Sequence, residues 1–205
     1  MKRGIYIMLE GGEGCGKDTQ AKLLEEYLLK KGYEVINTKE PGGTPEAEQI
    51  RNVLLKKENN LDDLTELFLY QAARKELNNK IIKPSIENGK IVISRRGFPS
   101  TFAYQGYAGG VNPELIEELN KISMHEIFPD LLFIIDIDPE TGLKKETNPD
   151  RFAAKKIDYH NKVRQGYLKV AEKYPHISMV IPYQEGNLEK MQEQIRHHLK
   201  KRFNI

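Results

Sequence analysis

The chain has 205 residues, 39% of them hydrophobic and 30% charged, which suits one globular domain with a single core. Its 32 basic and 30 acidic residues give a net charge of only +2, so we expect no nucleic-acid partner and no membrane partner. The single cysteine excludes an intrachain disulfide. Because the sequence also has no secretory signal and no apolar run of membrane length, we expect a cytoplasmic protein.

Hydrophobic periodicity and turn residues predict strands and helices that alternate along the chain. Strands are predicted at residues 4–9, 34–38, 90–94, 131–138 and 177–181. Helices are predicted at residues 17–31, 46–57, 61–88, 99–107, 113–127, 150–174 and 188–203. The third of these helices contains Pro84 and could break there. The alternation predicts an α/β fold, in which a five-stranded parallel sheet is flanked by helices on both faces.

The most informative segment joins the first strand to the first helix. It is a glycine-rich turn whose Gly11, Gly16 and Lys17 follow the pattern of a phosphate-binding loop. Glycine lets a polyanion approach the backbone closely, and the following helix presents its positive dipole end to the phosphates. The alternative is an ordinary glycine-rich turn with a surface lysine. Asp18 departs from the pattern, because a metal-binding hydroxyl is expected there, and Thr19 lies one residue later.

The predicted helix over residues 61–88 carries side chains suited to a planar base. Glu66, Tyr70 and Arg74 are spaced by four residues and therefore share one helix face. An aromatic ring and an arginine on one face can sandwich a base and bind its carbonyl oxygen. A core tyrosine beside a solvated arginine is the alternative explanation.

The segment after the third strand adds further candidates. Thr101, Tyr104 and Gln105 share a face of the predicted helix over residues 99–107, and glutamine offers both a donor and an acceptor to a pyrimidine edge. Arg96, at the end of a strand, could hold a phosphate. The alternatives are an ordinary amphipathic helix and a solvated arginine.

Together these segments give the chain a resemblance to the thymidylate kinases over nearly its whole length. The Glu-Pro-Gly-Gly-Thr loop at residues 40–44 and the Ala-Tyr-Gln-Gly element at 103–106 are specific to this family among phosphate-loop kinases. Other matching segments lie at residues 10–17, 50–51, 66–74, 92–96, 129–130, 138–143, 150–152 and 163–168. The resemblance implies a nucleoside monophosphate kinase fold and transfer of the ATP γ-phosphoryl group to dTMP, giving dTDP and ADP, with Mg²⁺ as cofactor.

The resemblance also implies which residues act on each nucleotide. The ATP-binding residues would be Gly11, Gly12, Glu13, Gly14, Cys15, Gly16, Lys17, Asp18 and Thr19. The dTMP-binding residues would be Glu13, Glu40, Arg51, Tyr70, Arg74, Arg96, Ser100, Thr101, Tyr104 and Gln105. The catalytic residues would be Lys17, Asp18, Arg96, Lys144, Lys145 and Arg151.

The resemblance further implies one domain over residues 1–205 with a mobile lid at about 139–152, and a homodimer. Tyr70 stands where the family usually has a phenylalanine that stacks on thymine. Gly14 stands where some relatives carry a catalytic arginine, so the basic lid residues become the candidates for that role, with a solvated basic loop as the alternative. Leu64, Leu67 and Phe68 could supply a self-complementary dimer face, or they could belong to the core.

Two positions depart from the family pattern. Arg95 stands where an aspartate is expected, and Asp18 stands where a threonine or serine is expected. We hypothesise a swap in which Asp18 contributes to the Mg²⁺ site and pairs with Arg95, since a carboxylate is a suitable ligand for this ion. Alternatively, Thr19 supplies the metal-binding hydroxyl and Asp18 has no such role.

Two other functions stay open on the sequence alone. A kinase of the same class could prefer dUMP or another nucleoside monophosphate, because one methyl group discriminates by only roughly 10–200-fold. The departures at Asp18 and Arg95 also allow a nucleotide-binding protein with weakened catalysis.

Overall fold

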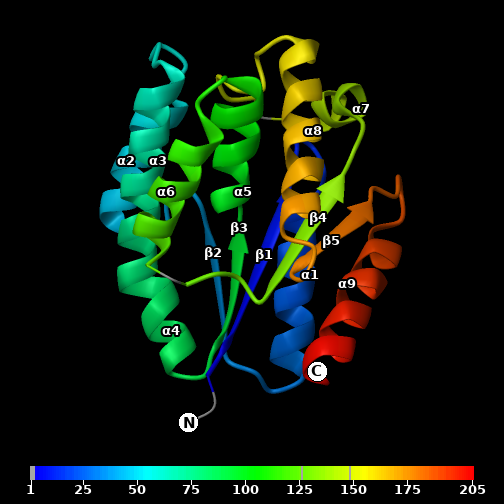
Figure 1. Cartoon of the computed structure of the whole chain (residues 1–205). Helices are drawn as coiled ribbons and strands as arrows, with labels where there is room; N and C mark the ends of the chain where they lie inside the picture. The colour runs from blue at the N-terminus through cyan, green and yellow to red at the C-terminus, as the bar shows by residue number, and fades with distance from the viewer. Residues whose placement is uncertain (1–2, 126, 148) are drawn as a thin grey trace.

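A computed structural model describes residues 3–125, 127–147 and 149–205 (Figure 1). In this part of the chain, five parallel strands form one sheet in the order β2-β3-β1-β4-β5. The strands are β1 (Ile5–Gly11), β2 (Val35–Lys39), β3 (Ile91–Arg95), β4 (Leu131–Asp136) and β5 (Ser178–Pro182). The predicted five-stranded parallel sheet is therefore confirmed.

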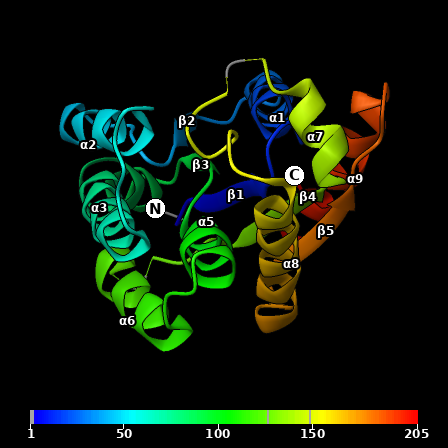
Figure 2. The same ribbon diagram turned by 90° about the horizontal axis from the view of Figure 1, so that it is seen from above.

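Helices cover both faces of the sheet, as predicted (Figure 2). The α-helices are α1 (Lys17–Lys30), α2 (Pro45–Leu55), α3 (Asp63–Leu77), α4 (Lys83–Glu87), α5 (Phe98–Thr101), α6 (Pro113–Met124), α7 (Pro139–Lys145), α8 (Ile157–Lys173) and α9 (Leu188–Phe203). Two π-helical segments are η1 (Asn78–Ile82) and η2 (Phe102–Ala108). Among the described residues no helix is both long and apolar enough to cross a membrane.

The central strands are buried on both faces, which explains their continuous apolar sequences. Successive side chains of a strand point to opposite faces. In β1, Tyr6 and Met8 therefore join the core beneath α3, α5 and α8, whereas Ile7 and Leu9 join the core beneath α1 and α9. The loops that follow the carboxyl ends of the strands gather at one edge of the sheet (Figure 1).

Several predicted helices differ from the observed ones. The helix predicted over residues 61–88 is interrupted by η1 just before Pro84, because a proline removes a backbone donor and its ring crowds the preceding turn. The helix predicted over 99–107 becomes π-helical from Phe102. The helix predicted over 113–127 ends at Met124, and its residue 126 lies outside the described residues.

The region predicted as the lid, residues 139–152, contains the short helix α7, and its residue 148 lies outside the described part. The helix predicted to start at residue 150 starts only at Ile157. Asp150 accounts for this later first residue. Its carboxylate accepts hydrogen bonds from the backbone N–H groups of Phe152 and Ala153 and stabilises a turn there.

The glycine-rich loop between β1 and α1 packs closely against α7. Gly14 has a φ of 64°, and a Cβ atom at this position would lie 2.0 Å from the carbonyl oxygen of Gly142. Both the backbone conformation and this close approach therefore require glycine. The absence of an arginine at residue 14 thus has a structural cause in this chain.

We predict that Gly14→Ala lowers the free energy of unfolding by about 1–3 kcal/mol, because alanine is strained at a positive φ and collides with α7. Gly12→Ala is the control, since a Cβ at Gly12 would meet no heavy atom within 4 Å. This control should stay within about 1 kcal/mol of the parent. Urea unfolding of both variants measures the difference, and an equal loss in the two would contradict the prediction.

Candidate functional site

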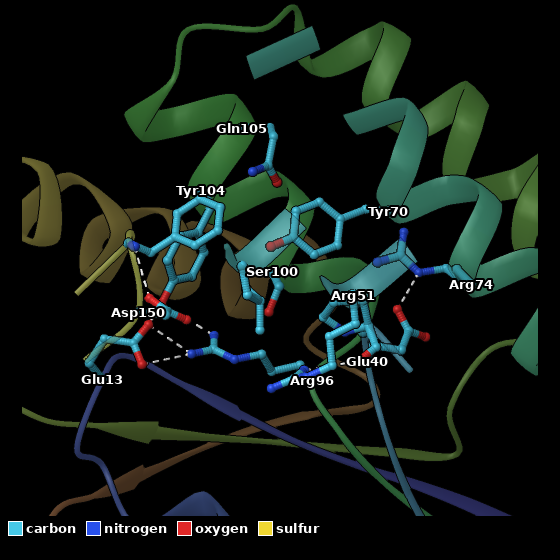
Figure 3. Close-up of a pocket in the computed structure, with 14 residues that line it drawn as sticks. Glu13, Glu40, Arg51, Tyr70, Arg74, Arg96, Ser100, Tyr104, Gln105 and Asp150 are labelled. Atoms are coloured by element: carbon cyan, nitrogen blue, oxygen red, sulfur yellow. Dashed lines mark hydrogen bonds and ion pairs between the residues drawn. The ribbon is translucent and has the colours of Figure 1, made fainter. Parts of the chain in front are cut away.

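Two connected hollows lie at the carboxyl ends of the strands. The deep cavity, of about 480 Å³, is lined by Glu13, Glu40, Pro41, Arg51, Leu55, Tyr70, Arg74, Arg96, Gly97, Ser100, Tyr104, Gln105, Asp150 and Phe152 (Figure 3). The polar cleft is lined by Glu13, Lys17, Asp18, Lys39, Glu40, Arg51, Arg95, Arg96, Glu146, Asp150 and Ala153. Five residues line both hollows, so one leads into the other.

The glycine-rich loop forms the floor of the polar cleft. Lys17 is largely buried at the start of α1, and its ammonium group donates a hydrogen bond to the carbonyl of Gly12 over 3.2 Å. Asp18 and Thr19 are exposed on the same first turn. Cys15 is fully buried, and this burial raises the pKa of its thiol. Its side chain packs in the hydrophobic core and does not line the cleft.

Arg96 joins this loop to the deep cavity. It follows β3 with a φ of 67°, an uncommon conformation for a residue other than glycine. Its guanidinium binds both carboxylate oxygens of Glu13, at 2.9 and 3.0 Å, and donates to the hydroxyls of Tyr104 and Tyr167. Although burial raises the pKa of Glu13, the charges of Arg96 and Lys17 lower it to about 2, so this carboxylate is ionised.

This arrangement is supported by a buried carboxylate, that of Glu10, to which the sequence analysis gave no role. Glu10 accepts hydrogen bonds from the backbone N–H of Gly97, from the hydroxyl of Ser100 and from the hydroxyl of Tyr167. Burial raises the pKa of Glu10. An acidic residue at the end of an otherwise apolar strand was the available signal, because such a group must find partners inside the protein.

Arg74 lies at another wall of the deep cavity and is fully buried. Its Nε binds a carboxylate oxygen of Glu40 over 2.7 Å, and its Nη1 donates to the side-chain oxygens of Gln71 and Asn120. No acceptor among the described residues engages its Nη2. Arg74 therefore has a fixed orientation and a donor left for a ligand.

Aromatic rings and a third arginine complete the cavity. Phe152, which sequence reasoning did not single out, packs with ring centroids 6.5 Å from Tyr70 and 5.7 Å from Tyr104. Arg51 donates to the carbonyl of Pro41 over 2.9 Å and lines both hollows. Asp150, also missed, lines both hollows as well.

Most of the residues that were predicted to bind dTMP lie together in the deep cavity. Those that line it are Glu13, Glu40, Arg51, Tyr70, Arg74, Arg96, Ser100, Tyr104 and Gln105. Thr101 does not, because its buried hydroxyl donates to the carbonyl of Phe98 and to Asn120 instead.

The three predicted lid cations do not line the polar cleft in this conformation. Lys145 pairs with Glu185 over 2.9 Å and lies over the ring of Tyr183. Arg151 forms an ion pair with Glu66 over 2.6 Å and donates to the carbonyl of Leu54. Lys144 is exposed and has no partner among the described residues.

The predicted pairing of Asp18 with Arg95 is confirmed. A guanidinium nitrogen of Arg95 lies 3.0 Å from one carboxylate oxygen of Asp18, and its Nε donates to the carbonyl of Thr38. The other Asp18 oxygen has no partner among the described residues. Within the same residues, no group of three or more histidine, cysteine, aspartate or glutamate side chains could hold a metal ion by itself.

The residues suggested for a dimer face divide between surface and core. Leu64 and Phe68 are 40% and 53% exposed, but Leu67 is fully buried. Leu67 packs within the hydrophobic core and therefore does not belong to the exposed face.

Comparisons with known proteins agree with this geometry. The family described as thymidylate kinase matches residues 9–195. The thymidylate kinase of Thermoanaerobacter sp. (strain X514) is 43% identical over 175 residues, covering 84% of this chain and 86% of that protein. The thymidylate kinase of Clostridium novyi (strain NT) is 42% identical over 182 residues, covering 86% and 89%.

A solved structure extends the similarity to the fold. The crystal structure of thymidylate kinase from Ehrlichia chaffeensis superposes with a TM-score of 0.81 at 37% sequence identity, covering 97% of this chain and 99% of that one. The family match spans far more than half of the chain, and several relatives exceed 30% identity. The chain belongs to the thymidylate kinase family.

Proposed function

We propose that the protein is an ATP-dependent dTMP kinase, which transfers the γ-phosphoryl group of ATP to the 5′-phosphate of dTMP and forms dTDP and ADP. The observation that carries this proposal is the continuity of the deep cavity with the polar cleft that contains Lys17. A base held in the cavity places its phosphate in the cleft, opposite the loop that holds the donor phosphates. The relatives named above carry the same activity in their names.

Charge and position account for the chemistry. Lys17 and the loop N–H groups hold the donor phosphates, while Arg51 and Arg96 lie where the two hollows join and hold the acceptor phosphate. Phosphoryl transfer depends mainly on alignment and neutralisation of charge. The acceptor oxygen is already anionic at neutral pH, so no strong general base is required.

Mg²⁺ fits the residues beside Lys17. This ion typically takes one or two carboxylates together with phosphate oxygens and water molecules. Asp18 has one carboxylate oxygen without a protein partner in the described region, and the hydroxyl of Thr19 is on the same exposed turn. We propose these two residues as the protein ligands, where the ion would neutralise charge on the β- and γ-phosphates.

Lys144 is the lid cation that we propose for the reacting phosphates, since no protein partner holds it elsewhere in the described region. We also propose a homodimer, supported by the exposed Leu64 and Phe68, which lie one turn apart on α3. A cytoplasmic location stays a prediction.

The acceptor is tested by release of ADP with a panel of nucleoside monophosphates. We expect the highest kcat/KM with dTMP, and a value lower by roughly 10–200-fold with dUMP, which lacks only a methyl group. Lys17→Ala is the control and should lose at least about a hundredfold with every acceptor. A higher kcat/KM for another monophosphate would contradict dTMP as the acceptor.

The swap is tested by a double-mutant cycle with Asp18→Thr and Arg95→Asp. Each single variant leaves one charge without its partner, so each should lose activity, whereas the double variant restores the threonine and the aspartate that the family pattern expects. We expect coupling of about 0.5–3 kcal/mol in kcat/KM, measured over a range of Mg²⁺ concentrations. Losses that simply add would mean that the two positions act independently.

The dimer is tested by Phe68→Glu. A charge placed on a self-complementary apolar face should leave the variant monomeric in light scattering at concentrations where the parent is a dimer. Leu29→Glu, a change at an exposed position on α1, is the matched control and should not alter the parent's mass. A monomeric parent would refute the proposed assembly.

A further inference from the structure

Beside Gln105, which lines the deep cavity, three separate elements bring polar side chains together. Glu66 comes from α3, Gln105 from η2, and Arg151 from the turn before α8. Their burial is nearly complete, with 1% of the Glu66 side chain and 10% of the Arg151 side chain exposed. The reaction proposed above assigns no role to Glu66 or to its pairing with Arg151.

Glu66 fixes the orientation of the Gln105 amide. Its carboxylate pairs with the guanidinium of Arg151 over 2.6 Å, and a carboxylate in such an ion pair can only accept hydrogen bonds. Its other oxygen lies 2.7 Å from the Gln105 amide. The Gln105 group at this contact must therefore be its NH₂, because only a donor can bind a carboxylate oxygen.

The Gln105 carbonyl oxygen is left for a ligand. No donor among the described residues engages it, and the side chain lines the deep cavity. Figure 3 shows the amide of Gln105 pointing into this cavity, near Tyr70. With the free Nη2 of Arg74, the cavity thus presents one fixed acceptor and one fixed donor.

We infer that Glu66 is a specificity-determining positioning residue, which makes the cavity select bases that present an N–H group beside a carbonyl oxygen. Thymine and uracil present N3–H and O4 in this way, whereas cytosine presents an acceptor and an amino group. An amide free to rotate would accept either pattern. The inference rests on the proposed function, and it gives Arg151 the task of holding the Glu66 carboxylate in place through their ion pair when the turn at residues 150–153 lies against α3.

The test is Glu66→Gln, assayed with dTMP, dUMP and dCMP. A glutamine at residue 66 can donate or accept, so the Gln105 amide can rotate, and we expect the ratio of kcat/KM for dTMP over dCMP to fall about tenfold or more, mainly through KM. The ratio for dTMP over dUMP should not change, because these bases share the same edge. An equal loss with all three acceptors would assign Glu66 a merely structural role and overturn the inference.

Two further variants complete the test. Glu76→Gln is the matched control, because it makes the same change on an outer part of α3, where Glu76 pairs with Lys80, and it should leave every ratio unchanged. If Glu66→Gln does not fold, Arg151→Gln replaces it, since loss of the ion pair leaves the Glu66 carboxylate free to turn away from the Gln105 amide, which can then rotate. An unchanged ratio of dTMP over dCMP in Arg151→Gln would then overturn the inference. If the parent phosphorylates no pyrimidine monophosphate, the proposed function itself fails.

Discussion

The ion pair between Arg96 and Glu13 is the contact on which the site depends. Glu13 belongs to the loop after β1 and Arg96 follows β3, and these strands are neighbours in the sheet. Both oxygens of the carboxylate are engaged by one guanidinium nitrogen, so the donor loop and the acceptor cavity have a fixed relative position. The unusual φ of Arg96 aims the guanidinium at this loop, and the buried Glu10 holds the next residue, Gly97, through its N–H group.

The polar cleft is balanced in charge before any nucleotide binds. Its basic side chains are Lys17, Lys39, Arg51, Arg95 and Arg96, and its acidic side chains are Glu13, Asp18, Glu40, Glu146 and Asp150. Cations so close together would repel one another without these carboxylates. Phosphates that enter the cleft therefore compete with existing carboxylate partners, and the affinity for a nucleotide is a difference between two sets of ion pairs. The same reasoning explains why an aspartate at residue 18 is tolerated beside a phosphate site, since Arg95 compensates its charge.

Sequence reasoning located the site because its residues follow strands and carry recognisable chemistry. It failed where helix geometry or a distant partner decides the outcome. Thr101 was expected on the face of Tyr104 and Gln105, but η2 winds as a π-helix, and Thr101 instead faces Asn120 on α6. Arg151 was expected at the phosphates, yet the turn stabilised by Asp150 sends it to Glu66 on α3.

The sequence by itself determined the alternation of strands and helices, the phosphate-binding loop and the family, because these depend on periodicity and on residues adjacent in the chain. Apart from the pair of Asp18 with Arg95, only the tertiary structure decided which partners the charged side chains find. Glu10 with Ser100, Arg74 with Glu40 and Glu66 with Arg151 join residues 34 or more positions apart. A charged side chain buried in the folded protein must find a partner there, and the identity of that partner depends on how the elements pack rather than on local sequence.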